Sequence, residues 1–402
     1  MMPASLPPRR RAETVSCADA AQQVVLDRRN DLIALSHDIH AEPELAFAEH
    51  RSCAKTQALV AERGFTITPA PGGLDTAFRA EHGSGDLAVA VCAEYDALPG
   101  IGHACGHNII AASAVGAALA LAEVADDIGL RVVLMGTPAE ESGGGKALLL
   151  KAGAFDDISA AVMIHPGPAD IAAYRSLAAA GVTVDYVGHE SHASVAPHLG
   201  VNAGDAVTIA QVAIGLLRQQ LAPGQQVHGI ATETGRAPNV IPGQATMRYL
   251  MRAIEKESLR ALEQKVFDCF RAGGLATGCE CRIDEGEAYD ELRSDPWLAG
   301  AFRDEMTRNG RTPLDEDPDV ARPVGSTDMG NVTQAMPGIH PIVGVEAGGA
   351  YPHQPEFAAA AASPSADDAV VDGAIMLART VIRLAETPSQ RHRVMQAKAD
   401  RG

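Results

Sequence analysis

The chain has 402 residues, of which 46% are hydrophobic and 21% are charged, a composition typical of a globular protein and not of a disordered or fibrous chain. Its 33 basic and 51 acidic residues give a net charge of -18, which argues against nucleic acid or an anionic membrane as the main binding partner. An anionic substrate would therefore need a local positive feature, such as metal ions.

The cysteines and the N-terminal residues predict where the protein works. Seven cysteines are scattered along a long chain, unlike the dense, even-numbered framework of a secreted scaffold, and they favour a reducing compartment. The first 20 residues contain basic side chains but no apolar run after them, so we expect neither a secretory signal nor a membrane anchor. No stretch reaches the roughly 18 apolar residues of a spanning helix. We predict a cytoplasmic protein.

Stretches with helical periodicity alternate with apolar runs of strand length in the first 170 residues. The expected helices are residues 18–40, 44–63, 109–124 and 146–151, and the expected strands are residues 86–93, 130–136 and 160–164. Such alternation predicts a mostly parallel sheet sandwiched by helices, an α/β fold. In these sheets the chemistry collects on the loops at the carboxyl ends of the strands.

After residue 174 the pattern changes to the two-residue alternation of half-buried strands. The expected strands are residues 181–188, 226–236, 244–253 and 280–287, and the expected helices are residues 205–221 and 255–272. This βαββαβ order predicts a ferredoxin-like unit with an antiparallel sheet. We interpret residues 179–289 as an inserted lid and dimerisation domain, and residues 1–178 and 290–402 as a discontinuous catalytic metallohydrolase domain. The chain should end in a helix over residues 367–384 and a frayed tail.

The sharpest local signal is the sequence His103-Ala104-Cys105-Gly106-His107, which follows the strand at residues 86–93 and opens the next helix. Thiolate and imidazole are both good ligands for zinc and related ions. The alternative is a glycine-containing turn with one core cysteine and two histidines at a helix start. The motif therefore needs support from the rest of the chain.

The next two predicted strands also end at residues with ligand chemistry. Glu140 and Glu141 follow residues 130–136, and because adjacent side chains point in different directions, one can bind metal while the other accepts a proton. His165 follows residues 160–164, and His353 lies in a loop rich in glycine and proline. An isolated acidic pair would be a solvated loop, but three successive strand ends favour one shared metal site.

Seven segments, in order along the chain, resemble a family of metal-dependent amidohydrolases and metallopeptidases. The family contains aminoacylases, hippurate hydrolases, auxin-conjugate hydrolases and p-aminobenzoyl-glutamate hydrolase, and the resemblance is to the branch with a cysteine metal ligand. The segments are HDIHAEPELAFAE from His37, EYDALPGIGHACGHN from Glu94, PAEES from Pro138, HPGP from His165, GHESHASVAPHLG from Gly188, APNVIPGQA from Ala237 and HQPEF from His353.

The resemblance implies two divalent metal ions per subunit, zinc or manganese, with cobalt and nickel as alternatives. The implied metal ligands are Cys105, His107, Glu141, His165 and His353. If the Cys105 sulfur and one water both bridge, these ligands fill the eight positions of two tetrahedral ions.

The resemblance also implies the residues that act around the metals. Glu140 would be the general base. His192 of the insertion would stabilise the oxyanion and bind substrate, in its own subunit or across a homodimer; the alternative is that His192 only caps a loop of the lid. Asp96 would orient a metal-bound imidazole from behind, and Asn239 would bind the polar end of the substrate.

Two sequence features narrow the resemblance to one sub-branch of this family. Asn108 follows His107 where most relatives with this cysteine loop have aspartate, and the segment GSTDMGNV begins at Gly325; both resemble the sub-branch of p-aminobenzoyl-glutamate hydrolase and Xaa-basic dipeptidases. We predict that a metal-activated water hydrolyses the amide of a small N-acyl or N-aroyl amino acid or a dipeptide. The alternatives are a metal-dependent aryl C–N hydrolase (deaminase) and a non-catalytic dimeric binding protein, which would have lost a ligand or the base.

Overall fold

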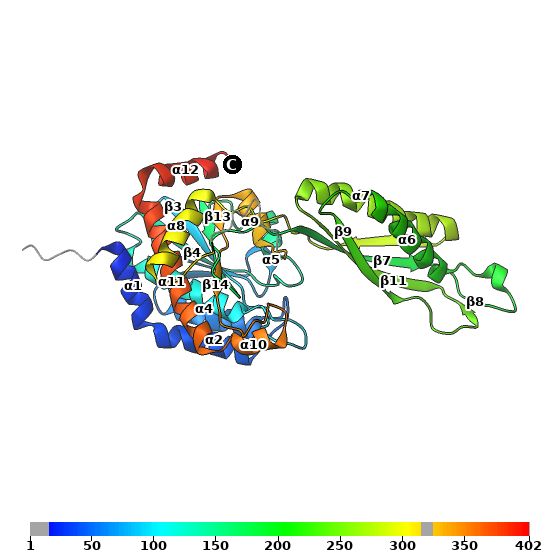
Figure 1. Ribbon diagram of the computed structural model, residues 1–402, viewed down its shortest axis with the longest axis horizontal. Helices are drawn as coiled ribbons and strands as arrows, with labels where there is room; N and C mark the ends of the chain where they lie inside the picture. Colours follow the sequence, from blue (N-terminus) through cyan, green and yellow to red (C-terminus); the bar gives the residue numbers. More distant parts are fainter. Residues whose placement is uncertain (1–15, 315–324, 402) are drawn as a thin grey trace, which may run out of the picture.

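The computed structural model describes residues 16–314 and 325–401. Two lobes lie side by side and are joined by extended segments (Figure 1). We name the larger one the catalytic lobe and the smaller one the lid lobe, after the roles predicted from the sequence. Residues 1–15, which include most of the segment that predicts the absence of a targeting signal, lie outside the described residues.

A six-stranded sheet forms the centre of the catalytic lobe. Its strands are β1 (Thr66–Pro69), β2 (Phe78–His82), β3 (Leu87–Ala93), β4 (Leu130–Gly136), β5 (Ala160–Val162) and β13 (Gly338–Ile339). Their order is β1-β2-β4-β3-β5-β13; β4, β3, β5 and β13 are parallel, whereas β1 and β2 form an antiparallel edge. The predicted mostly parallel sheet is confirmed.

Helices cover both faces of this sheet. They are α1 (Cys17–Asp27), α2 (Arg29–Ala41), α3 (His50–Ala61), α4 (His107–Val124), α5 (Gly145–Lys151), α8 (Pro296–Arg308), α9 (Met329–Ala335), α10 (Pro355–Ala360), α11 (Pro364–Glu386) and α12 (Pro388–Ala399). Along β3, Val89 and Val91 enter one hydrophobic core while Ala90 and Cys92 enter another. Because successive side chains of a strand point to opposite faces, a strand covered on both sides is apolar throughout.

Although we expected no stretch of this kind, one helix among the described residues has the length and hydropathy of a membrane span. It is α4, and 89% of it is buried inside the protein. The helix packs against β3 on one side and α11 on the other. It is therefore the central core helix of the catalytic lobe.

The structure corrects three predicted helical segments. The helix expected over residues 18–40 is two helices, α1 and α2, which meet at Arg28. The helix expected from residue 44 begins only at His50, because the preceding loop contains Phe47 with a left-handed φ of 61°. The prediction of a frayed tail is wrong. Helix α12 buries Val394, and Arg393 donates two hydrogen bonds to Asp295, of 2.6 and 2.9 Å.

The lid lobe has the predicted βαββαβ order. Its main elements are β7 (Ala178–Val187), α6 (Ala203–Leu217), β9 (Gln226–Glu233), β11 (Gln244–Ala253), α7 (Lys256–Thr277) and β12 (Glu280–Glu285). The antiparallel sheet has the order β12-β7-β11-β9, and it packs with α6 and α7 around a core of its own that includes Tyr186, Met247 and Phe270. The expected α/β fold with a ferredoxin-like insertion is confirmed.

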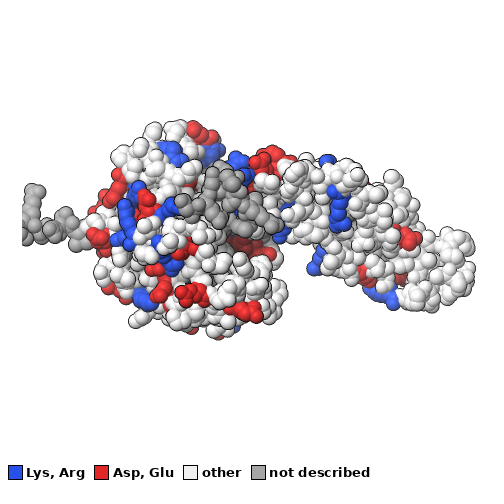
Figure 2. All heavy atoms as spheres, viewed as in Figure 1, with Lys and Arg blue, Asp and Glu red and all other residues white. Residues whose placement is uncertain are grey.

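A short pair of strands lies at the end of the lid lobe farthest from the catalytic lobe (Figure 1). β8 (Ser191–His192) pairs with β10 (Val240–Ile241) in antiparallel register. We call this pair and its loops the lid tip. Most of its surface is uncharged in Figure 2, whereas acidic and basic side chains are interspersed over the catalytic lobe.

Candidate active site

The residues with ligand chemistry follow the carboxyl ends of the parallel strands. β4 lies on one side of β3 and β5 on the other, and α/β proteins bind ligands at such a reversal of strand order. Asp96 closely follows β3, and Glu140 closely follows β4. His165 begins β6 (His165–Gly167), a short strand after β5 that pairs with β14 (Ile342–Gly344). The predicted strand ends therefore converge.

Gly106 lets the cysteine loop lie against the segment after His165. Its φ of 74° is in the left-handed region, and an added Cβ would lie 2.5 Å from Cγ of Pro166. Glycine alone tolerates both constraints without strain. His103, the first histidine of the motif, is buried with its ring 6.2 Å from that of His40, and it belongs to no cluster of metal donors among the described residues.

The five predicted metal ligands come together at this edge of the sheet. Within the described residues, four overlapping groups have all donor atoms within 4.8 Å: Cys105 with His107 and His165, Cys105 with Glu141 and His353, His107 with Glu140 and Glu141, and Glu94 with Glu140 and Asp328. Sγ of Cys105 is 3.6 Å from Nε2 of His165, and Oε2 of Glu141 is 3.4 Å from Nε2 of His353. The sulfur of Cys105 is shared by two of the groups.

Two residues of the site have strained backbone conformations. Ala139 and His353 have φ angles of 59° and 70°, which cost non-glycine residues about 1–3 kcal/mol each. Hydrogen bonds hold both in place: the N–H of Ala139 donates to Oε1 of Glu49 at 2.8 Å, and the N–H of His353 donates to the carbonyl of Ala104 at 2.8 Å. The second bond fastens the His353 loop to the cysteine loop.

Asp96 orients His107. One oxygen of Asp96 is 2.9 Å from Nδ1 of His107, so Nε2 is left to face the donors; the other accepts from the N–H of Glu141 at 2.9 Å. Burial disfavours the charged imidazole of His107, but Asp96 outweighs it and the pKa of His107 is well above its usual value. Burial and the charge of His107 lower the pKa of His165 to about 4, which keeps that imidazole neutral, as ligation requires.

Glu140 is buried at the end of β4, with an exposure of 7%. Burial and nearby carboxylates, chiefly Glu94, raise the pKa of the Glu140 carboxyl well above its usual range. A raised pKa makes a carboxylate a better proton acceptor near neutral pH. The Tyr289 hydroxyl fixes the loop, because it donates to the carbonyl of Glu140 at 2.5 Å and accepts from the N–H of Gly144 at 3.0 Å.

Sequence reasoning missed a buried ion cluster beside these residues. The ammonium of Lys146 contacts Oε1 of Glu94 and lies 2.6 Å from Oδ1 of Asp328, and all three side chains have zero exposure. Glu94 lies in the quoted segment EYDALPG, directly after β3, and its signal was a polar residue at a strand end; Asp328 lies in GSTDMGNV, directly before α9. Asn108, where most relatives with this cysteine loop have aspartate, donates a side-chain N–H to the Ser36 hydroxyl at 2.8 Å.

The structure does not bring the two predicted lid residues to the other site residues within one chain. His192 lies on β8 at the lid tip (Figure 1), and its Nδ1 accepts from the N–H of Ser194 at 3.3 Å. Asn239 is beside it, since its carbonyl accepts from the N–H of Ala193 at 2.9 Å. Both residues belong to the lobe opposite the metal donors.

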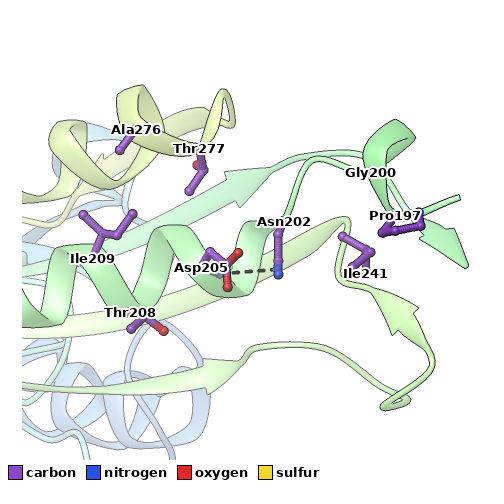
Figure 3. Close-up of a pocket in the computed structure, with 9 residues that line it drawn as sticks. All are labelled: Pro197, Gly200, Asn202, Asp205, Thr208, Ile209, Ile241, Ala276 and Thr277. Carbon is purple, nitrogen blue, oxygen red and sulfur yellow. Dashed lines mark hydrogen bonds between the residues drawn. The ribbon is translucent and has the colours of Figure 1, made fainter. Parts of the chain in front are cut away.

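A hollow of about 540 Å³ lies on the lid lobe and not at the metal donors (Figure 3). Polar groups in its wall are already paired: Oδ1 of Asn202 accepts from the N–H groups of Gly204 and Asp205, and the Thr277 hydroxyl donates to the carbonyl of Gly273 at 2.9 Å. The site is therefore assigned from its chemistry and not from the size of a hollow.

The residues at the strand ends fit divalent metal ions. Nε2 of His107, Oε1 of Glu141 and Oε2 of Glu94 are buried and have no hydrogen-bond partner among the described residues, which is rare for buried polar atoms. Carboxylates here outnumber the single ammonium of Lys146, and buried charges of one sign need counter-ions. Thiolate, imidazole and carboxylate are the ligands that zinc and its neighbours use.

The fold and the site together define a metal-dependent hydrolase with an α/β fold. A sequence model of "Peptidase family M20/M25/M40" matches residues 90–383. The chain therefore belongs to peptidase family M20/M25/M40. Membership confirms the predicted resemblance and a hydrolytic enzyme that cleaves an amide or peptide bond with divalent metal ions; it favours neither deamination nor a non-catalytic binding role.

Individual relatives agree with this family. An Xaa-Arg dipeptidase of Mus musculus is 40% identical over 379 residues, which cover 89% of this chain and 86% of that protein. One of the subunits of the p-aminobenzoyl-glutamate hydrolase of Escherichia coli is 32% identical over 274 residues, 62% of this chain and 57% of that protein. A dinuclear metal binding peptidase of the M20 family from Bacillus subtilis has a similar fold, with a TM-score of 0.66 and 22% identity over 90% of this chain and 99% of that chain.

Proposed function

We propose that this enzyme is a dipeptidase with two divalent metal ions per subunit and that it releases a basic amino acid from the C-terminus of a dipeptide. The observation that carries the proposal is the convergence of thiolate, imidazole and carboxylate donors in overlapping groups at one edge of the sheet. The name and coverage of the mouse relative, 40% identical over 86% of its length, support the choice of substrate. The amide of an N-acyl or N-aroyl amino acid is the second candidate, which the Escherichia coli relative supports.

The proposed ligands are five of the residues in these donor groups: Cys105, His107, Glu141, His165 and His353. Cys105 belongs to two groups, which supports a thiolate between two ions. Zinc and manganese are the proposed metals. Ions bound there would lower the pKa of water to about 7 and polarise the substrate carbonyl.

Glu140 is the proposed general base. It accepts a proton from the attacking water, whose oxygen bonds to the amide carbon. The C–N bond then breaks, and Glu140 returns the proton to the leaving nitrogen, so that the products are a carboxylic acid and an amine. Asp96 holds His107 in one orientation throughout, because its oxygen stays on Nδ1.

We assign residues 179–289 to the lid and dimerisation domain and residues 1–178 and 290–402 to the catalytic domain. In this assignment His192 donates a hydrogen bond to the oxyanion and Asn239 binds the polar end of the substrate. Their place at the lid tip requires closure of the lobes or delivery from a partner subunit. Which of the two applies determines whether an isolated subunit can be active.

His192→Ala should lower kcat by about 10²–10³-fold, the usual loss when one oxyanion donor is removed. Metal content should be unchanged, because His192 is far from the donor groups. His392→Ala, which removes an exposed histidine of α12, is the matched control and should keep wild-type turnover. Steady-state kinetics with metal analysis of each variant checks this; an unchanged kcat for His192→Ala would make that histidine a structural cap.

A homodimer through the lid lobe is the proposed assembly. β9 is an edge strand, which presents unpaired backbone groups to a second chain. Val212 and Leu216 lie one turn apart on α6 and are 59% and 70% exposed, and Ile230 of β9 is 62% exposed. Exposed apolar side chains and an open sheet edge on the same lobe are typical of an interface.

The double substitution Leu216→Glu with Ile230→Glu should convert the dimer to a monomer. Both side chains are exposed in the single chain, so the folded subunit should keep its stability while the interface buries two unpaired charges. Leu26→Glu, at a leucine of α1 that is 43% exposed, is the matched control. Light scattering after size-exclusion chromatography gives the mass; a monomeric wild-type protein would contradict the assembly.

The function is tested by metal analysis followed by a screen for amine release. The purified protein should contain divalent metal, lose activity when a chelator removes it, and regain activity with Mn²⁺ or Zn²⁺. The screen compares dipeptides ending in arginine or lysine with matched dipeptides ending in leucine, N-acetyl and N-benzoyl amino acids, and p-aminobenzoyl-glutamate. A preparation that holds no metal would overturn the proposal, and cleavage of the acylated substrates alone would replace it with the second candidate.

We also propose that the protein works in a reducing compartment such as the cytoplasm. All seven cysteines are free in the structure, which supports a reducing environment such as the cytoplasm.

A further inference from the structure

Glu94 has no role in the proposed mechanism, although it lies at the centre of the site. It directly follows β3, and its side chain is completely buried. Oε1 contacts the ammonium of Lys146, whereas Oε2 has no hydrogen-bond partner within residues 16–314 and 325–401. A buried carboxylate oxygen without a partner is costly, so its presence calls for a ligand that the protein side chains do not supply.

The unpaired oxygen faces an unpaired nitrogen. Oε2 of Glu94 is 3.5 Å from Nε2 of His107, and Nε2 also has no hydrogen-bond partner in the part of the chain that the structure describes. Two donors on one tetrahedral zinc ion, at the usual bond lengths, are about 3.3–3.6 Å apart. The spacing matches that of two other pairs of proposed ligands, Cys105 with His165 at 3.6 Å and Glu141 with His353 at 3.4 Å.

Lys146 and Asp328 fix the direction of the Glu94 side chain. Asp328 accepts from both the backbone N–H and the ammonium of Lys146, at 2.8 and 2.6 Å. The ammonium in turn holds Oε1 of Glu94. Because one oxygen is bound behind the site, the other is directed at His107, and no rotation is needed to reach an ion there.

We propose that Glu94 is a further metal ligand, which shares with His107 one of the two divalent ions. This inference rests on the proposed function, since it assumes that ions bind at the donor groups. Oxygens of Glu140 and Glu141 each lie 3.9 Å from Nε2 of His107, so the surroundings of this ion are rich in carboxylate. Carboxylate ligands suit Mn²⁺ better than thiolate does, and Mn²⁺ binding should therefore depend on Glu94.

The test is calorimetric titration of the full-length protein, stripped of metal by a chelator, with MnCl₂. The wild-type protein should bind two ions. Glu94→Gln keeps the shape of the side chain but removes its charge, and it should raise the dissociation constant of one ion by at least about tenfold. Glu305→Gln is the matched control, because Glu305 is a buried glutamate of α8, 3% exposed, and it should bind Mn²⁺ as the wild type does.

A second variant distinguishes the loss of a metal ligand from the loss of folding. Glu94→Asp keeps the negative charge near Lys146 but shortens the side chain by one methylene, so its free oxygen is withdrawn from His107; it should weaken the same ion. Circular dichroism establishes that each variant is folded. Folded Glu94 variants that bind two Mn²⁺ ions with wild-type affinity would overturn the inference and leave the proposed function intact, whereas a wild-type protein that binds no Mn²⁺ or Zn²⁺ would overturn both.

Discussion

Glu140→Gln is expected to lower kcat by about 10²–10⁴-fold while the enzyme keeps its metal, because an amide cannot accept the proton that the attacking water must lose. Glu140 is buried among carboxylates that raise its pKa. Removing its charge therefore relieves repulsion in the metal-free protein, and we expect no loss of stability. Single-turnover kinetics and metal analysis of the same preparation measure the two quantities.

The neighbouring residue supplies the control. Glu141→Gln should also lose activity, but together with metal, because its carboxylate lies between His107 and His353. The two adjacent glutamates would then differ in what their loss removes, a proton acceptor in one case and a ligand in the other. Full turnover by Glu140→Gln with normal metal content would show that another group is the base.

Lys146→Met is expected to destabilise the metal-free protein by about 3–5 kcal/mol, because it leaves the carboxylates of Glu94 and Asp328 buried without their counter-ion. All three side chains have zero exposure, so water cannot screen the charges that remain. Urea unfolding followed by circular dichroism gives the free energy of unfolding.

A triple variant separates the loss of the charge from the loss of packing. Lys146→Met combined with Glu94→Gln and Asp328→Asn removes both unpaired charges, and most of the lost stability should return. If Lys146→Met alone unfolds at the wild-type urea concentration, the cluster contributes no net stability.

The strands of the catalytic lobe were predictable because their signal is local. β4 lies at residues 130–136 as expected, since a run of apolar residues suffices to identify a strand covered on both faces. Helix ends were less predictable. The break at Arg28 interrupts a continuous apolar pattern, and the order of α12 depends on Arg393 reaching Asp295, 98 residues earlier in the chain.

The residues of the candidate site also differ in how far local sequence signals could predict them. Cys105, Glu141 and His165 each follow a recognisable strand, so their convergence could be predicted from the rule that parallel strands end at one edge. The backbone bond that brings His353 to Ala104 has no local signature, and only the resemblance of HQPEF to a known motif pointed to it. The distance of His192 and Asn239 from the metal donors could not be predicted, because it depends on how the two lobes are arranged.

The amino-acid sequence by itself determined the family and the class of fold and indicated the candidate donors of a metal site, since periodicity and short motifs express these properties within a few residues. Only the tertiary structure decided the electrostatic surroundings of that site. Lys146 is 52 residues from Glu94 and 182 from Asp328, and no periodic pattern connects them. Packing excludes water around all three, and burial without water is what makes their charges depend on one another.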